Sequence, residues 1–132
     1  NKKNLNRRIA TMPKILLAED DPTMLSLLKT LLRLEGFDSS PLGEHDDVLE
    51  AIRREKPDVV LLDVNLPQGN GVDFLHRIRQ DDDLKNTVII MSSGMPYETE
   101  CLAAGANAFL LKPYMPDTLI NAIKLRLIDQ KP

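Results

Sequence analysis

The chain has 132 residues, 42% of them hydrophobic and 28% charged, as expected for one soluble globular domain with its own core. The formal net charge is −3, but residues 1–13 hold four bases and no acid, so the rest of the chain is distinctly acidic, which argues against nucleic-acid binding by this domain. One cysteine excludes an internal disulfide, two histidines do not make a zinc site, and no apolar run has the length of a membrane span or the pattern of a secretory segment, which together predict a cytoplasmic protein.

Residues 1–13 are polar and basic and end at Pro13. They lie outside the pattern of the remaining chain, so they are predicted to be an N-terminal extension: a linker, a tag remnant or the end of an upstream helix. The domain itself is predicted to span residues 14–132, with its chemistry independent of the extension.

From Lys14 onward, short apolar runs typical of buried parallel strands alternate with segments of helical periodicity. In chain order, strands are predicted over 14–18, 37–42, 59–62, 87–91 and 107–111, and helices over 22–35, 43–56, 71–80, 96–104 and 116–128. Five β-α units in succession require parallel pairing and right-handed crossovers. The predicted fold is therefore a three-layer, doubly wound α/β domain with helices on both faces of one five-stranded sheet.

The helices carry apolar faces and end signals of their own. The helix over 22–35 is preceded by Asp21, interpreted as a helix-start acid, and has a broad apolar face of Met24, Leu27, Leu28, Leu31, Leu32 and Leu34. In the helix over 71–80, the side chains expected to point inward are Val72, Leu75 and Ile78. Both histidines and the acidic run 81–83 are interpreted as solvated.

Reactive side chains follow four of the predicted strands, at the edge where ligands bind in open α/β sheets. They are Glu19 and Asp20 after the first strand, Asp63 after the third, Ser92 after the fourth and Lys112 after the fifth. Three clustered carboxylates form a site for a hard divalent cation, usually Mg²⁺. With the metal bound, Asp63 can attack a phosphorus atom, while the metal, the lysine and the hydroxyl interact with the phosphoryl oxygens.

Each residue taken alone has a simpler interpretation. Asp63 could cap a turn or the next helix, Ser92 could be a turn residue, and Lys112 could be a surface charge. Four such residues at four strand ends of one sheet are improbable by coincidence, which favours a common site.

The residues that carry this pattern also carry a family resemblance. The segments KILLAEDDP, VVLLDVNLPQGNG, VIIMSSG and GANAFLLKPY, within residues 14–130, resemble the receiver domain of bacterial two-component response regulators in order and nearly in spacing. The resemblance implies the flavodoxin-like strand order 2-1-3-4-5 that is characteristic of such receiver domains.

The resemblance implies a role for each acidic residue of the site. Asp63 matches the phosphoacceptor, and Glu19 and Asp20 match the acidic pair, of which Asp20 would ligate Mg²⁺ directly and Glu19 mostly through water. Asn65 matches the position whose backbone carbonyl ligates the metal. Mg²⁺ is accordingly the implied cofactor.

Three further positions match the residues that respond to phosphorylation. Ser92 matches the hydroxyl that follows the phosphoryl group, and Lys112 matches the invariant lysine, followed by Pro113 after a bond that is typically cis. Phe109 matches the aromatic switch position, here without a hydroxyl. Two departures from the family pattern are the short Ser92-to-Lys112 separation of 20 residues and a glycine at position 94.

The implied function is that of a phosphorelay receiver and not of an enzyme beyond its own phosphorylation and dephosphorylation. Its partner would be a histidine kinase or a phosphotransfer protein, with an undefined downstream effector and a homodimer left open. A phosphatase of the haloacid dehalogenase type is disfavoured, because Asn65 stands where that class needs an acid and no residues remain for a cap domain. An adaptor that keeps the fold without phosphorylation is disfavoured, because Asp63 and Lys112 are both present.

Overall fold

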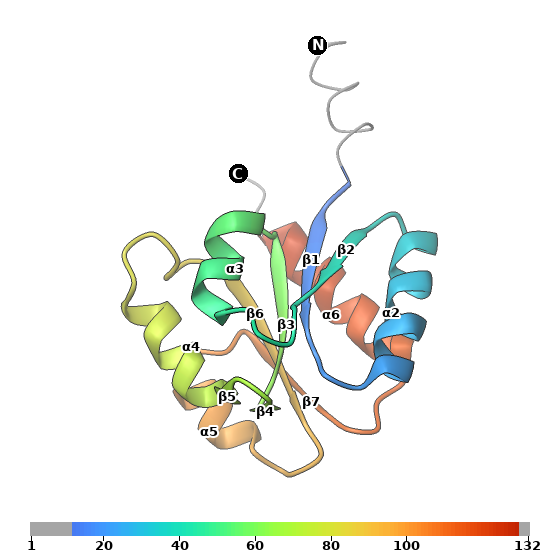
Figure 1. Ribbon diagram of the computed structural model, residues 1–132. Helices are drawn as coiled ribbons and strands as arrows, with labels where there is room; N and C mark the ends of the chain where they lie inside the picture. Colours follow the sequence, from blue (N-terminus) through green and yellow to red (C-terminus); the bar gives the residue numbers. More distant parts are fainter. Residues whose placement is uncertain (1–11, 130–132) are drawn as a thin grey trace.

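A computed structural model describes residues 12–129 and shows a central parallel sheet between two layers of helices (Figure 1). The sheet has the order β2-β1-β3-β6-β7, which confirms the predicted order 2-1-3-4-5. Its strands are β1 (Lys14–Ala18), β2 (Asp38–Pro41), β3 (Val59–Asp63), β6 (Val88–Ser93) and β7 (Ala108–Leu111). Its helices are α2 (Pro22–Leu34), α3 (Val48–Glu55), α4 (Gly71–Gln80), α5 (Glu98–Ala103) and α6 (Pro116–Asp129).

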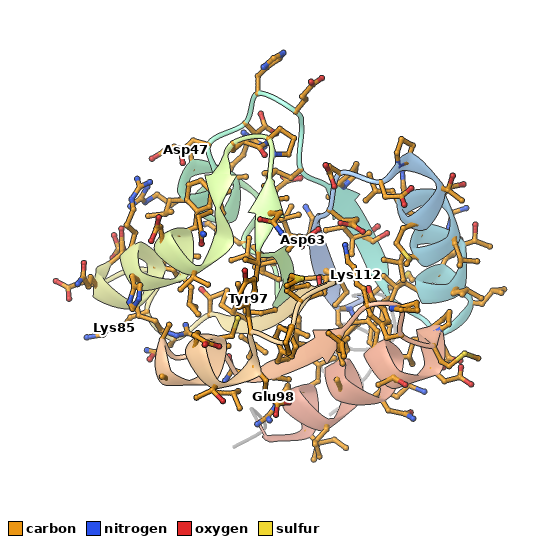
Figure 2. All side chains as sticks on the ribbon, turned by 90° about the horizontal axis from the view of Figure 1, so that it is seen from below. Asp47, Asp63, Lys85, Tyr97, Glu98 and Lys112 are labelled. Atoms are coloured by element: carbon orange, nitrogen blue, oxygen red, sulfur yellow. The ribbon has the colours of Figure 1, made fainter. Side chains whose placement is uncertain are left out.

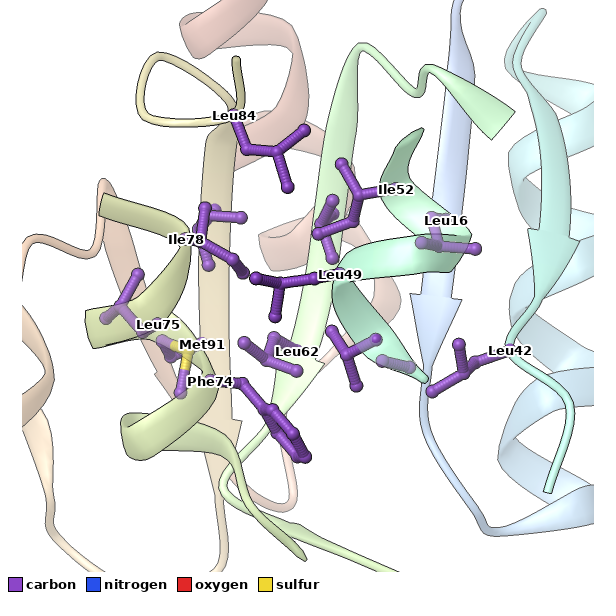
Figure 3. Close-up of a cluster of buried hydrophobic side chains, with 14 of the residues drawn as sticks. Leu16, Leu42, Leu49, Ile52, Leu62, Phe74, Leu75, Ile78, Leu84 and Met91 are labelled. Atoms are coloured by element: carbon purple, nitrogen blue, oxygen red, sulfur yellow. The ribbon is translucent and has the colours of Figure 1, made fainter. Parts of the chain in front are cut away.

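Two core clusters lie on opposite faces of the sheet, because successive strand residues point to opposite sides. The first core cluster joins the sheet to α3, α4 and α5. Figure 3 shows this cluster and labels several of its members, among them Leu49, Leu62, Phe74 and Met91. The second core cluster joins the other face to α2 and α6 through Leu28, Leu32, Leu119, Ile120 and Ile123. The three central strands are buried on both faces, as their continuous apolar runs predict.

The predicted helix over 43–56 begins five residues late, at Val48. The carboxylate of Asp46 accepts a hydrogen bond from the backbone N–H of Gly43 at 2.8 Å, which closes a turn before the helix. The carboxylate of Asp47 then caps the helix by accepting from the N–H of Leu49 at 3.2 Å. The two acids therefore form the helix boundary and do not lie inside the helix.

The predicted apolar face of α2 is broader than the buried stripe. Leu28 and Leu32 are buried, but Leu27 is 46% exposed and Leu34 is 78% exposed, because they point away from the sheet. The prediction for Asp21 is confirmed: its carboxylate accepts hydrogen bonds from the N–H groups of residues 23 and 24 as the helix N-cap.

Smaller differences concern α4, β6 and the loops. In α4, Val72 is only half-buried and Phe74, which the periodicity did not single out, is buried in the first core cluster. Strand β6 continues to Ser93, so Ser92 lies within the strand. Within the predicted acidic loop, Asp81 forms an ion pair with Arg53 and is not simply solvated.

Arg79, near the end of α4, connects this helix to the loop before β6 and the turn before β7. It lies at the end of the sheet where these strands begin, away from the acids. Its guanidinium donates hydrogen bonds to the carbonyl oxygens of Gly105 at 2.9 Å, Lys85 at 2.9 Å and Thr87 at 2.7 Å, and to Asn107 Oδ1 at 2.9 Å. The α4–β6 loop and the α5–β7 turn are therefore held by one side chain, which the sequence pattern does not single out.

Residues 1–11 of the predicted extension lie outside the described residues, so the boundary at residue 13 stays a prediction. Pro13 itself accepts a hydrogen bond from the N–H of Asp38 at 2.9 Å, beside the start of β1. Within residues 12–129, no helix combines the length and the apolar character needed to cross a membrane.

Candidate functional site

The carboxyl ends of the central strands bring the predicted residues together at one edge of the sheet. Asp63 is paired in register with Ser92 across β3 and β6, and the alternation of side chains places both on the face of the second core cluster. Figure 2 views this edge and shows Asp63 and Lys112 pointing toward each other. The chain segments that carry them are 49 residues apart in sequence.

Lys112 joins two of the carboxylates directly. Its Nζ atom lies 2.8 Å from Glu19 Oε1 and 2.8 Å from Asp63 Oδ2, and the side chains of these acids are only 3% and 7% exposed. Burial of a carboxylate is unfavourable unless it is paired and hydrogen-bonded. The lysine therefore pairs with two buried acids, offsets one of their two negative charges and fixes their relative position.

The protonation of Glu19 is tied to its surroundings. Burial, followed by the hydrogen bond that it shares with Asp63, raises the pKa of Glu19 to about 7 against the opposing effect of Lys112. Burial lowers the pKa of Lys112, but its hydrogen bonds to Asp63 and Glu19 outweigh burial and raise it. Lys112 consequently stays charged at neutral pH, while Glu19 is poised to exchange a proton.

Glu19, Asp20 and Asp63 form an acidic triad that fits a divalent cation. One carboxylate oxygen from each lies within 4.8 Å of the others. Glu19 and Asp63 are buried, whereas Asp20 is exposed and opens the triad to solvent. Oxygen ligands with several open positions suit Mg²⁺, which keeps part of its water shell in proteins. The predicted Mg²⁺ site is therefore consistent with the geometry.

A short hairpin, β4 (Asn65–Leu66) paired with β5 (Gly69–Asn70), follows Asp63 between β3 and α4. The N–H of Asn65 donates to Asp63 Oδ1 at 3.3 Å, which orients the carboxylate. Beyond the hairpin, a Cβ atom at Gly71 would lie 2.2 Å from the carbonyl oxygen of Asp63, so the start of α4 can approach the acid only without a side chain. The metal-ligating role of Asn65 stays a prediction.

Ser92 is 2% exposed and lies beside Asp63, as predicted. The next residue, Ser93, is also buried, and its hydroxyl accepts a hydrogen bond from the N–H of Met95 at 3.0 Å. The carbonyl oxygens of these two serines accept from the N–H groups of Val64 and Lys112. Residues 92 and 93 thus link β3, β7 and the loop that leads to α5.

Phe109 lies on the opposite face of the sheet from the acids. It is half-buried and packs against the first core cluster, while its neighbour Leu110 belongs to the second. The bond between Lys112 and Pro113 is cis, which confirms that part of the resemblance.

Tyr114, which the sequence pattern does not single out, lies close to the lysine. Burial, and then the nearby Glu19 carboxylate, raises the pKa of Tyr114 to about 12. Its ring packs against the second core cluster. Tyr114 lies between the last predicted strand and the last predicted helix, and nothing in the sequence there distinguishes a buried tyrosine from an exposed one.

A doubly wound sheet with an acidic triad, a hydroxyl and a lysine at one edge defines a CheY-like signalling domain that contains an acidic pocket for phosphorylation of an aspartate. The model of the response regulator receiver domain family matches residues 15–124. The chain belongs to this family, and a histidine kinase is the partner that such a domain implies.

Similar proteins agree with this assignment. The DNA-binding response regulator MtrA of Mycolicibacterium smegmatis is 33% identical over 114 residues, which are 86% of this chain and 50% of that protein. The chain spans about half the length of the curated relatives it matches. The receiver domain of the Francisella response regulator 1452 superimposes on this chain with a TM-score of 0.82 at 27% identity. The superposition covers 90% of this chain and 99% of the Francisella domain.

One solved structure bears on the metal. The receiver domain of the sensor histidine kinase PA1611 from Pseudomonas aeruginosa, which holds a magnesium ion in its active site cleft, has a TM-score of 0.74 and 27% identity. The superposition covers 89% of this chain and 98% of the PA1611 domain. Its magnesium agrees with the cation chemistry of the triad Glu19, Asp20 and Asp63.

Proposed function

We propose that Asp63 accepts a phosphoryl group from a phosphohistidine on a histidine kinase or a phosphotransfer protein. The observation that carries the proposal is the contact of Lys112 Nζ with both Asp63 Oδ2 and Glu19 Oε1 at 2.8 Å. Asp63 is the member of the triad that combines contact with the lysine and register pairing with a hydroxyl residue.

In the transfer, a carboxylate oxygen of Asp63 forms a bond to phosphorus as the phosphorus–nitrogen bond to histidine breaks. The electron pair of that bond stays on the imidazole nitrogen, and because the other ring nitrogen carries a proton, the histidine leaves as neutral imidazole. Asp20, Asp63 and the carbonyl of Asn65 would hold Mg²⁺ directly and Glu19 mostly through water, and the bound ion would supply charge neutralisation for the phosphoryl oxygens. Lys112 provides a second positive charge for these oxygens.

Ser92 and Phe109 are proposed to transmit the change. The hydroxyl of Ser92 donates a hydrogen bond to a phosphoryl oxygen and draws the β6–α5 loop toward the site. Phe109 then turns further inward at low cost, because its ring has no hydroxyl to desolvate. The surface formed by α5, β7 and α6 changes and alters the binding of a downstream partner, as a population shift between two states.

The setting of the domain is part of the proposal. The acidic composition and the lack of cysteine pairs support a cytoplasmic protein whose receiver does not itself bind nucleic acid. Relatives named as DNA-binding response regulators are about twice as long as this chain. The alternatives for the whole protein are a stand-alone receiver, a larger regulator and a hybrid kinase, and a homodimer is left open with each of them.

Labelling with acetyl phosphate and Mg²⁺ tests the assignment. Intact-mass measurement should show one phosphoryl addition to the wild type and none to Asp63→Asn. Asp82→Asn is the matched control, since Asp82 has a 97% exposed side chain in the loop after α4, and it should be labelled as the wild type is. Equal labelling of Asp63→Asn, mapped to a residue outside the triad, would refute the proposal.

A further inference from the structure

The hydroxyl group of Tyr114 is buried and has no hydrogen-bond partner among residues 12–129. A buried hydroxyl without a partner costs free energy, so such a group in a folded protein calls for an explanation. The ring packs against the second core cluster, which holds the hydroxyl in place. Phosphoryl transfer to Asp63, as proposed, makes no use of this group.

Tyr114 lies on the same face and at the same end of the sheet as the acids. Ile15 and Leu17 of β1 belong to the second core cluster, so alternation along the chain points Glu19 to that face as well. Tyr114 follows Lys112 by two residues and packs on this face. Burial, and then the Glu19 carboxylate, raises the pKa of Tyr114 to about 12, while Lys112 lowers it. Glu19 is thus the carboxylate that acts most strongly on the hydroxyl.

Lys112 has all three N–H bonds of its ammonium group engaged in the unphosphorylated protein. Its Nζ atom lies 2.8 Å from Glu19 Oε1, 3.0 Å from Glu19 Oε2 and 2.8 Å from Asp63 Oδ2. An ammonium group has no further donor, so Lys112 can pair with several phosphoryl oxygens only by giving up contacts that it makes now. Glu19 holds two of these three contacts and is the acid that stands to lose a donor.

We propose that Tyr114 is a positioning residue that donates a hydrogen bond to Glu19 when Lys112 turns to the phosphoryl group. Phosphorylation adds acceptor oxygens on the side of Asp63 and draws the ammonium group toward them. The flexible Glu19 side chain, released from a lysine contact, then turns to the phenolic O–H. The unpaired hydroxyl destabilises the resting protein, and its pairing stabilises the phosphorylated one. The inference rests on the proposed function.

Replacing Tyr114 by phenylalanine tests this role, because it removes the hydroxyl and keeps the ring. Beryllofluoride, which mimics the phosphoryl group, should bind Tyr114→Phe about five- to tenfold more weakly in NMR titrations with Mg²⁺, the loss expected for one hydrogen bond. The melting temperature of the resting variant should be unchanged or higher, because a buried unpaired group is removed. Tyr97→Phe is the matched control, since Tyr97 is exposed, and should bind beryllofluoride as the wild type does.

Ultraviolet absorption locates the hydrogen bond. The chain has two tyrosines and no tryptophan, so in a Tyr97→Phe background the phenol absorption belongs to Tyr114 alone. Donation to a carboxylate shifts this absorption to longer wavelength, and the shift should appear when beryllofluoride binds. It should also appear in Lys112→Met with Mg²⁺ and no beryllofluoride, because that substitution releases Glu19 directly. For the same reason, Tyr114→Phe should lower the melting temperature of Lys112→Met but not that of the wild type.

The outcomes for the inference and for the proposed function are distinct. Failure of the wild type to bind beryllofluoride and to be labelled by acetyl phosphate would refute the proposed function, whereas the comparisons in Lys112→Met need no phosphoryl group. The inference is overturned if Tyr114→Phe binds beryllofluoride as tightly as the wild type, or if it is destabilised equally with and without beryllofluoride. Absence of the absorption shift in Lys112→Met would overturn it as well.

Discussion

Replacing Lys112 by methionine should destabilise the protein in a way that Mg²⁺ and acid both reverse. The substitution keeps an unbranched side chain, one atom shorter, but removes the cation that contacts Glu19 and Asp63 at 2.8 Å. Breaking a buried ion pair by removing one partner costs about 3–5 kcal/mol. Because the lysine side chain is 24% exposed and water can enter, we expect a loss at or just below the lower end of this range, about 2–3 kcal/mol. For a domain of this size that loss lowers the melting temperature by roughly 10 °C.

The pH dependence follows from Glu19. Its pKa in the folded protein is about 7, above its ordinary value of 4.5, so the folded state favours the protonated acid and loses stability as pH rises from 4.5 through 7. Without Lys112, the ionised pair of acids has no cation, so the deficit relative to wild type should be largest above pH 7 and should shrink as pH falls toward 5. Mg²⁺ supplies the missing charge and should stabilise Lys112→Met more than the wild type.

Thermal and urea unfolding at several pH values, with and without Mg²⁺, measure these effects. Lys124→Met is the matched control: Lys124 pairs with Glu35 at 2.7 Å, but both side chains are at least 40% exposed, so its loss should cost under about 1 kcal/mol at every pH. If the deficit of Lys112→Met is the same at pH 5 and 8 and with saturating Mg²⁺, the lysine acts by packing and the electrostatic reasoning is wrong.

Three further outcomes are expected. Arg79→Met should lower the free energy of unfolding by about 2–4 kcal/mol through four lost hydrogen bonds, while the exposed Arg77→Met should cost under about 1 kcal/mol in the same urea titrations. Asp20→Asn should weaken Mg²⁺ binding at least tenfold by calorimetry, because a ligand is lost. It should also raise the melting temperature of the metal-free protein, because like-charge repulsion is relieved. Equal Mg²⁺ affinity in the variant and the wild type would show that Asp20 is not a metal ligand. With beryllofluoride, NMR shifts should spread from Ser92 through Phe109 to α5 and α6 and be much smaller beyond the site in Ser92→Ala; unchanged distal shifts would mean that the coupling takes another route.

The fold could be predicted because the buried strands coincide with continuous apolar runs in the sequence. Val59 to Leu62 are buried on both faces, and a run of this kind leaves little choice but a central parallel strand. The position of Asp63 at the end of that run is enough to place it at the sheet edge. The register that sets Asp63 opposite Ser92 was not predicted, because the apolar pattern places both residues at strand ends without fixing how the two strands pair.

Other features could not be predicted, because they depend on which of several compatible hydrogen bonds forms, in some cases between segments distant in sequence. Asp46 is compatible with a first helical turn or with closing the turn before it, and only its bond to Gly43 decides. Arg79 reads as one more surface arginine on α4, although its partners lie up to 28 residues away. Gln68 gave no signal for the same reason: its partner Gly43 lies on another loop.

Asp63 and Lys112 lie on the face of the second core cluster, whereas Phe109, the proposed switch residue, packs on the face of the first. A substitution in the first core cluster can change how Phe109 settles without touching an atom of the acidic triad. Under the proposed switch role of Phe109, such a substitution would alter the response to phosphorylation while the chemistry at Asp63 is kept. In a receiver that works this way, an engineer has separate residues to change for the chemistry at Asp63 and for the packing of Phe109, although Ser92 couples the two.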